Sequence, residues 1–233
     1  MNFNNFFKLL QSLGFAKYLI ISMHFFGLVF MLWQSTKDFF VNLTPINLLV
    51  SGILLAYHHD KKTSYFYVFF ACVAIIGFTV EVWGVKTGAI FGEYWYGKTL
   101  GIKLLEVPLL IGLNWAVLVI ATANLAEQFI DRQFTNTQLH TTDIYIKIIK
   151  SIIGAAFMTG LDYLIEPIAM YLDFWQWHNN SIPLQNYIAW FIIAFCLHFI
   201  YQQTTINKQN HVAITLLIAQ ILFFGVYNLI LTF

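Results

Sequence analysis

Four acidic side chains interrupt long apolar segments of this chain or lie at their ends: Glu81, Glu106, Asp162 and Glu166. An ionisable side chain inside a bilayer is costly unless it is paired or hydrated, so each is a candidate functional residue. Carboxyl groups that share a low-dielectric setting cannot all be ionised, and we expect at least one of them to keep its proton near neutral pH. A protonated carboxyl is the group that general acid catalysis requires.

Asp162 and Glu166 are four residues apart and therefore share one face of a helix. Asp162 lies about one turn deeper in its apolar segment than Glu166, and we assign to it the role of proton donor. Glu166 and Glu81 lie nearer the aqueous boundary, where we expect them to orient or deprotonate a water molecule. For any acid taken alone, a structural hydrogen bond is the alternative interpretation.

The composition restricts the class of protein that carries these acids. Of the 233 residues, 59% are hydrophobic and only 10% are charged, and the mean hydropathy is +0.70. A soluble domain carries roughly 25% charged residues, so soluble, disordered and coiled-coil proteins are excluded. A net charge of +1 provides no basic surface for nucleic acid. Cys72 and Cys196 lie in apolar runs, which argues against a disulfide framework or a thiolate metal site.

The elements that position the acids are predicted to be transmembrane helices. A helix needs about 20 mainly apolar residues to cross a bilayer. No segment alternates with period two, as the strands of a membrane barrel do. We therefore predict an all-α, polytopic integral membrane protein, a seven-transmembrane-helix bundle that forms a single domain over residues 1–233. The seven segments are 18–33, 41–57, 64–82, 104–123, 146–171, 182–201 and 212–232.

The distribution of lysine and arginine predicts the orientation of the bundle. Eight of these residues lie in connections on the N-terminal side and four on the opposite side. The positive-inside rule then places the N-terminus in the cytoplasm, and we expect the bundle to lie in the inner membrane. Because successive helices run in opposite directions, the four acids are all expected in the same half of the bilayer.

Aromatic residues gather in the two connections on the side of the acids, 81–108 and 171–187. Electron-rich ring faces stabilise cations by roughly 0.5–2 kcal/mol each, so we expect a long, apolar, aromatic-lined cleft beside the acids. An interfacial aromatic belt is the alternative for each ring taken alone. Asn114 is expected on the helix face of Glu106, where it would complete the polar floor of the site. The candidate substrate-binding residues are Trp83, Phe91, Tyr94, Trp95, Tyr96, Asn114, Trp115, Trp175 and Trp177.

The histidines are not expected to take part in chemistry. His198 lies in the segment 182–201 and is best interpreted as a core or interfacial histidine with its hydrogen bonds satisfied. His58 and His59 are expected to be solvated in a loop. No metal site is predicted.

Three blocks of the sequence, 84–115, 160–177 (GLDYLIEPIAMYLDFWQW) and 182–191, resemble the carotenoid biosynthesis membrane-protein family. The best-matched core is about residues 75–195. The family includes carotenoid 1,2-hydratases, which act on the ψ end of lycopene-like or γ-carotene-like substrates, and the related C50 carotenoid hydratases. The resemblance implies acid-catalysed addition of water to a terminal double bond of a carotenoid, with no metal and no cofactor. The lipid bilayer and other enzymes of carotenoid biosynthesis are the candidate partners, and nucleic acid is not.

The sequence also bears on four other functions. The last segment, 212–232, contains no lysine for a retinal Schiff base, which argues against a retinal protein. A membrane prenyltransferase needs two aspartate-rich motifs for Mg²⁺ and a diphosphate, and Asp162 with Glu166 supplies only one such pair. A carotenoid cyclase or isomerase, which starts from the same protonated alkene, stays open. A non-catalytic carotenoid-binding protein, with its carboxyls as structural hydrogen bonds, stays open as well.

Overall fold

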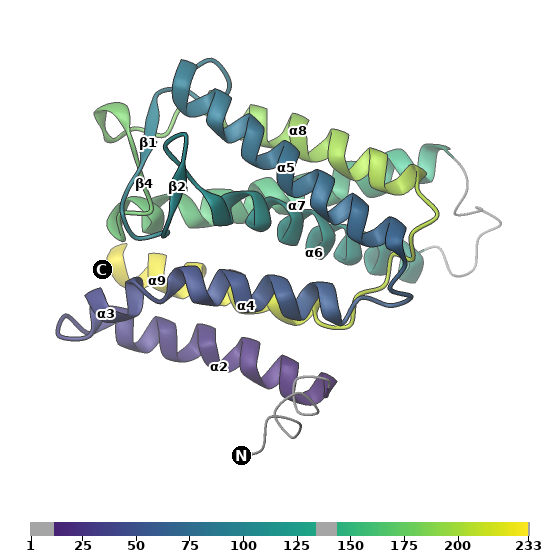
Figure 1. Ribbon diagram of the computed structural model, residues 1–233, viewed down its shortest axis with the longest axis horizontal. Coiled ribbons are helices and arrows are strands. Elements are labelled where there is room, and N and C mark those ends of the chain that lie inside the picture. The colour runs from purple at the N-terminus through teal and green to yellow at the C-terminus, as the bar shows by residue number, and fades with distance from the viewer. Residues whose placement is uncertain (1–11, 134–143, 233) are drawn as a thin grey trace.

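A computed structural model describes residues 12–133 and 144–232. Within these residues, seven helical segments are long and apolar enough to cross a membrane, which confirms the predicted all-α membrane bundle (Figure 1). A short helix, α3, precedes the second segment and joins it. The helices are α2 (Leu13–Leu32), α3 (Lys37–Val41), α4 (Thr44–Tyr57), α5 (Ser64–Thr87), α6 (Leu109–Gln133), α7 (Ile144–Tyr171), α8 (Leu184–Gln203) and α9 (Ala213–Thr232).

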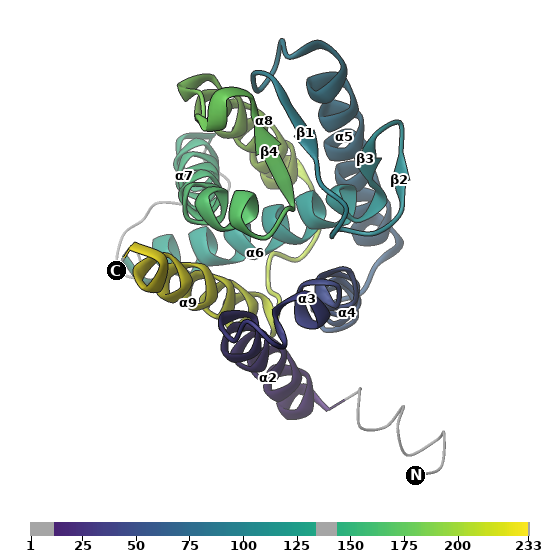
Figure 2. The same ribbon diagram turned by 90° about the vertical axis from the view of Figure 1, so that its left-hand side faces the viewer.

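Helix α6 forms the centre of the bundle. It packs against α5, α7 and α8 on one side and against α4 and α9 on the other, as Figure 2 shows. Buried residues make up 72% of its apolar segment, against 22–39% in the other spans. Small side chains suit this central position: Gly112 lies so close to α5 that an added Cβ would approach the Ala74 carbonyl oxygen to 2.5 Å. The outer helices expose their apolar faces, as expected for surfaces that contact lipid.

One end of the bundle is covered by a two-stranded ribbon (Figure 1). Strand β1 (Tyr94–Tyr96) pairs antiparallel with β4 (Trp175–Trp177), so that Tyr94 lies opposite Trp177 and Tyr96 opposite Trp175. After β1 the chain passes against the segment before β4 at Gly97. A Cβ on this glycine would lie 1.9 Å from the Asp173 carbonyl oxygen, so only glycine fits. The ribbon therefore ties the α5–α6 connection to the α7–α8 connection.

The start of α6 differs from the prediction. Residues 103–108 form a hairpin of β2 (Lys103–Leu104) and β3 (Val107–Pro108), and the helix begins at Leu109. Leu105 and Glu106 form the turn with positive φ angles of 51° and 72°, as a tight hairpin requires. Proline disfavours helical backbone in the residue before it, so Pro108 sets the boundary of α6. The predicted helical start at residue 104 was wrong.

The structure agrees with the prediction for one histidine and corrects it for two others. His198 is buried, with its Nδ1 2.7 Å from the Ala194 carbonyl oxygen and its Nε2 2.8 Å from the Thr122 hydroxyl. Both ring nitrogens are therefore hydrogen-bonded, as predicted for a core histidine. His58 and His59 are buried rather than solvated. The His59 ring stacks on Phe66 of α5 with centroids 3.6 Å apart, and its backbone pairs with Asn210 in the segment that precedes α9.

Candidate active site

A cavity of about 30 Å³ lies beneath the β1–β4 ribbon, at the ends of α5 and α7. Its volume is enough for about one water molecule. In the part of the chain that the structure describes, no lysine, arginine or histidine lines it. The lining residues are Glu81, Phe91, Tyr94, Tyr96, Ile111, Asn114, Trp115, Asp162, Ile165, Glu166, Trp175, Trp177, Asn186 and Trp190.

Glu81 extends from α5 into the cavity, and its side chain is buried. Its Oε2 accepts hydrogen bonds from the hydroxyls of Tyr94, at 2.5 Å, and Tyr96, at 2.8 Å. Its Oε1 accepts a third from the indole N–H of Trp115, at 2.9 Å. Burial opposes the ionised form of a carboxyl, and donated hydrogen bonds favour it, so these three side chains offset part of the cost of a charge at this position.

The strand geometry of β1 explains which of its aromatic residues reach the acid. Successive side chains of a strand point to opposite faces. Tyr94 and Tyr96 are therefore buried on the face of Glu81, whereas Trp95 is 52% exposed on the other. Burial, together with the Glu81 carboxyl, raises the pKa of both tyrosines well above its ordinary value. Both phenols thus stay protonated and keep donating their hydrogen bonds.

Asp162 and Glu166 share a face of α7, and each is buried. The amide of Asn186, on α8, donates to both carboxyls, at 3.0 Å to Asp162 Oδ2 and at 3.1 Å to Glu166 Oε1. The indole N–H groups of Trp175 and Trp177 donate to Glu166 Oε2 at 2.9 and 2.6 Å. Glu166 thus receives three donors and Asp162 receives one.

Asn114 and three of the predicted aromatic residues complete the walls of the cavity. Phe91 packs edge-on against Tyr94, with ring centroids 6.0 Å apart. Trp177 lies 5.0 Å from the Tyr94 ring, and Trp115 is fully buried beside Glu81. Asn114 lines the cavity from the second turn of α6. The carboxyls are therefore surrounded by aromatic rings.

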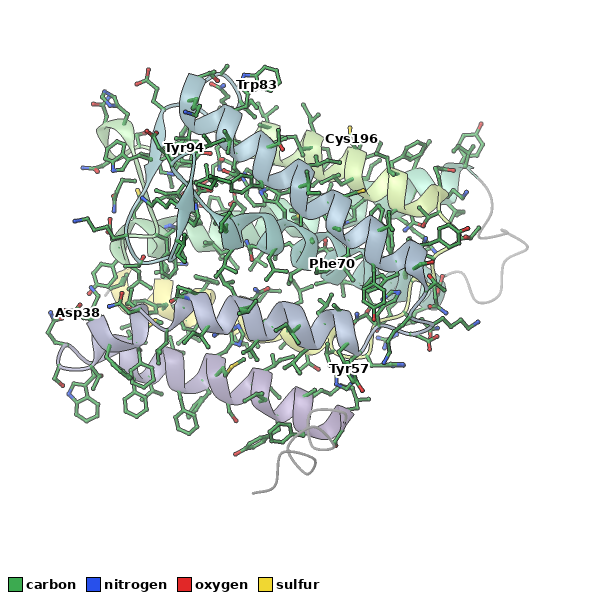
Figure 3. All side chains as sticks on the ribbon, viewed as in Figure 1. Asp38, Tyr57, Phe70, Trp83, Tyr94 and Cys196 are labelled. Carbon is green, nitrogen blue, oxygen red and sulfur yellow. The ribbon has the colours of Figure 1, made fainter. Side chains whose placement is uncertain are left out.

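Three of the predicted site residues lie elsewhere. Glu106 is exposed in the β2–β3 turn, because α6 starts after Pro108 and not before it. Trp83 is 61% exposed on the outside of α5, as an interfacial aromatic would be, and Figure 3 shows it apart from Tyr94. Trp95 faces away from the acids through the alternation of β1.

The expected long apolar cleft was also wrong, because the aromatic side chains that were to line it fill most of the space. Trp115 stacks on Trp190 with centroids 4.3 Å apart, and Trp175 and Trp177 reach across to Glu166. What remains is a cavity the size of a water molecule.

Two residues of the site, Asn186 and Trp190, were not predicted from the sequence. Asn186 is 1% exposed and bridges two carboxyls, and Trp190 stacks on Trp115. They are four residues apart and so share one face of α8. The available signal was an amide near the start of a predicted membrane helix, in the half of the bundle that holds the acids.

A further buried acid was missed because the predicted fourth span ended at residue 123. Glu127, near the other end of α6, forms an ion pair with Lys150 on α7 and accepts a hydrogen bond from Gln202 at 2.7 Å. Lys150 also reaches Asp131, at 3.2 Å. This second acidic cluster carries its own cation, whereas the cavity beneath the ribbon is lined by none. The two clusters therefore differ in electrostatic character.

Seven apolar helices around three buried carboxyls define a multi-pass membrane protein with an acidic site between its helices. The sequence model of a family described as carotenoid biosynthesis protein matches residues 43–233, and the chain belongs to that family. All residues that line the cavity fall within the match, and the family implies a carotenoid as substrate. Comparisons with curated proteins and with solved structures gave no match.

Proposed function

We propose that the protein hydrates a terminal ψ-end double bond of an acyclic or monocyclic carotenoid to a tertiary alcohol by acid catalysis. The observation that carries the proposal is the unequal hydrogen bonding of three buried carboxyls around one water-sized cavity. Glu81 and Glu166 each accept three hydrogen bonds, and Asp162 accepts one. Donated hydrogen bonds offset part of the cost of burying a charge, so ionisation is least favoured at Asp162, the acid that we expect to keep its proton.

Asp162 is the proposed proton donor. Its Oδ2 is held by Asn186, and its Oδ1 has no hydrogen-bond partner among the described side chains and backbone. A free carboxyl oxygen at the cavity is available to a substrate carbon. Glu81 and Glu166 are held in place by their donors, which suits them to orient a water molecule and to accept its proton.

The reaction balances without a further reagent. The Asp162 proton adds to C2 of the terminal double bond, and the positive charge develops on the tertiary carbon C1. Water attacks C1, and a neighbouring carboxylate, Glu166 or Glu81, takes the proton that water loses. Transfer of that proton back to Asp162 restores the site, so the net change is the addition of one water. The aromatic faces around the cavity stabilise the cation by roughly 0.5–2 kcal/mol each.

The size of the cavity bears on the mechanism in two ways. It accommodates a water molecule beside the acids, which favours hydration over cyclisation, because a cyclase would exclude water from the same cation. It does not accommodate a carotenoid end group, so the substrate must displace side chains to reach Asp162. Trp175 is only partly buried and stands at the edge of the ribbon, which makes it the side chain to be displaced.

The charge bias and the fold together suggest a location for the site. With the N-terminus in the cytoplasm, α5 and α7 both end on the outer side, which places the acids in the outer half of an inner membrane. Other enzymes of carotenoid biosynthesis would exchange substrate and product with the site through the bilayer.

The test is expression in a host that accumulates lycopene or γ-carotene, with mass analysis of the extracted pigments. Gain of one water supports the proposal. A change of absorbance at constant mass indicates a cyclase or isomerase, and an unchanged pigment that co-purifies with the protein indicates a binding function. Asp162→Asn keeps the shape of the donor and should abolish the product. Asp131→Asn, a matched change at the opposite end of the bundle, should leave product formation per folded protein unchanged.

A further inference from the structure

A second hollow lies between α2 and α4, on the side of α9, and its chemistry differs from that of the acid site. Two adjoining cavities of about 310 and 60 Å³ share Gly27, Met31, Thr44 and Asn47 among their lining residues. We call the two together the α2–α4 groove. Phe26 and Ile46 line the larger cavity and are about half exposed on the outer faces of α2 and α4. The groove therefore has an apolar mouth toward lipid.

The inner end of the groove is polar and incompletely hydrogen-bonded. Gln220, on α9, is 5% exposed, and its Oε1 has no partner within the described residues. The Oγ1 of Thr44 is buried and unpartnered in the same way. Nearby, His24 engages the Ile20 carbonyl through Nδ1 at 2.8 Å, which leaves Nε2 as an acceptor. Buried polar atoms are nearly always paired, so these acceptors point to a ligand that brings a hydrogen-bond donor.

The groove adjoins the acid site. Phe174 lines its smaller cavity, and the next residue, Trp175, lines the acidic cavity and donates to Glu166. The rings of Phe174 and Trp175 lie 6.3 Å apart. Because α2 and α7 run in the same direction, the groove and the acids lie toward the same end of the bundle (Figure 1). Two aromatic residues adjacent in sequence thus line one cavity each.

We infer that the α2–α4 groove binds the hydroxylated end of the polyene product, with Gln220 Oε1 accepting the hydrogen bond of the new tertiary hydroxyl. The apolar mouth suits a hydrocarbon chain. A hydroxyl can donate one hydrogen bond to Gln220 Oε1 and accept another from a hydroxyl such as that of Thr44. A movement of Phe174 and Trp175 would carry the end group from the acids to the groove. The identity of the ligand rests on the proposed function, and the groove and its unpaired acceptors do not.

The test measures pigment retention by the purified chain. The protein is reconstituted with lycopene or with 1-hydroxy-1,2-dihydrolycopene, and the bound pigment per chain is quantified after washing. We expect the hydroxylated probe to be retained in preference to lycopene. Gln220→Leu should reduce this preference by about three- to tenfold, the size of one hydrogen bond. Gly27→Leu should abolish retention of the hydroxylated probe, because the new side chain fills space shared by both cavities.

Gly225→Leu is the matched control, since a Cβ at Gly225 meets no atom within 4 Å. Equal retention by Gly27→Leu and Gly225→Leu would overturn the inference. So would equal binding of the two probes to the unaltered chain, or a phospholipid found bound in place of the pigment. Asp162→Asn makes the result independent of catalysis. If the unaltered chain hydrates nothing yet prefers the hydroxylated probe, the proposed function is refuted and the groove stands as a binding site.

Discussion

Trp177 Nε1 lies 2.6 Å from Glu166 Oε2, and this hydrogen bond joins the β1–β4 ribbon to α7. The two residues are eleven apart in sequence, on either side of the turn that ends the helix. The same oxygen also accepts from Trp175. One carboxylate oxygen thus fixes both inward rings of β4, and the position of the ribbon depends on it.

The change Trp177→Phe tests the importance of that hydrogen bond. It keeps the aromatic ring and removes the donor, and a hydrogen bond to a charged group contributes about 1.5–3 kcal/mol. We expect product formation to fall by roughly tenfold or more, since 1.4 kcal/mol is a factor of ten. Pigment analysis per folded protein is the measurement. Trp83→Phe, on the outer face of α5, should behave as the unaltered protein; an equal loss there would point to a general effect of removing an indole.

Asn186→Leu removes the amide that holds Asp162 and Glu166 together. Two buried carboxyl oxygens lose their shared donor, and each unsatisfied buried group costs about 1–3 kcal/mol. We expect a lower thermal unfolding midpoint and loss of product. Asn186→Gln offers the same amide on a longer stem and should recover part of the stability. Full activity of Asn186→Leu would show that the amide does not position the acids.

Gly77→Ala tests the packing of Trp115 against α5. An added Cβ at Gly77 would lie 2.4 Å from Trp115 Cγ, and Trp115 is fixed by Glu81 and by its stack on Trp190. We expect destabilisation by about 1–3 kcal/mol, as for an overpacked core. Gly160→Ala is the matched control, because nothing lies within 4 Å of its added Cβ. That change should stabilise α7 by roughly 0.5–1 kcal/mol. Thermal unfolding in detergent separates the two, and equal midpoints would contradict the packing argument.

The ion pair of Glu127 and Lys150 is expected to stabilise the fold without taking part in the chemistry. Lys150→Met leaves Glu127 buried without its cation, and breaking a buried pair in this way destabilises by about 3–5 kcal/mol. Glu127→Gln combined with Lys150→Met removes both charges and should recover most of the stability. Product formed per folded protein should stay unchanged in the double variant. A selective loss of product would place this cluster in the mechanism.

A phosphatase that is active only outside the cytoplasm, fused after Phe233, tests the orientation. Seven spans put the two termini on opposite sides, and the charge bias favours an external C-terminus. We therefore expect an active fusion. An inactive phosphatase fusion with an active cytoplasmic reporter at the same point would reverse the orientation and place the acids in the inner half.

The sequence was sufficient for the helices because hydropathy measures the property that lets a segment cross lipid. It was sufficient for Glu81, Asp162 and Glu166 as neighbours because alternation of direction and helical spacing are both readable from the chain. It failed at Glu106, where an apolar run concealed a hairpin that ends at Pro108.

The remaining site residues depend on contacts that no local pattern encodes. Asn186 acquires its significance only when α8 packs against α7. The inward direction of Tyr94 and Tyr96 follows from a strand too short to show alternation before its partner β4 is known. The small volume of the cavity follows from how the indole rings pack together, which depends on the whole bundle.

The ribbon has a consequence for how the site opens. Four donors to Glu81 and Glu166, namely Tyr94, Tyr96, Trp175 and Trp177, belong to its two strands. A movement that lifts the ribbon therefore opens the cavity and breaks these four hydrogen bonds to Glu81 and Glu166 at the same time. The ribbon thus controls both access to the cavity and the hydrogen bonds that favour charge on the two acids. On the proposed mechanism, closure of the ribbon over the substrate would restore these hydrogen bonds before the proton is transferred.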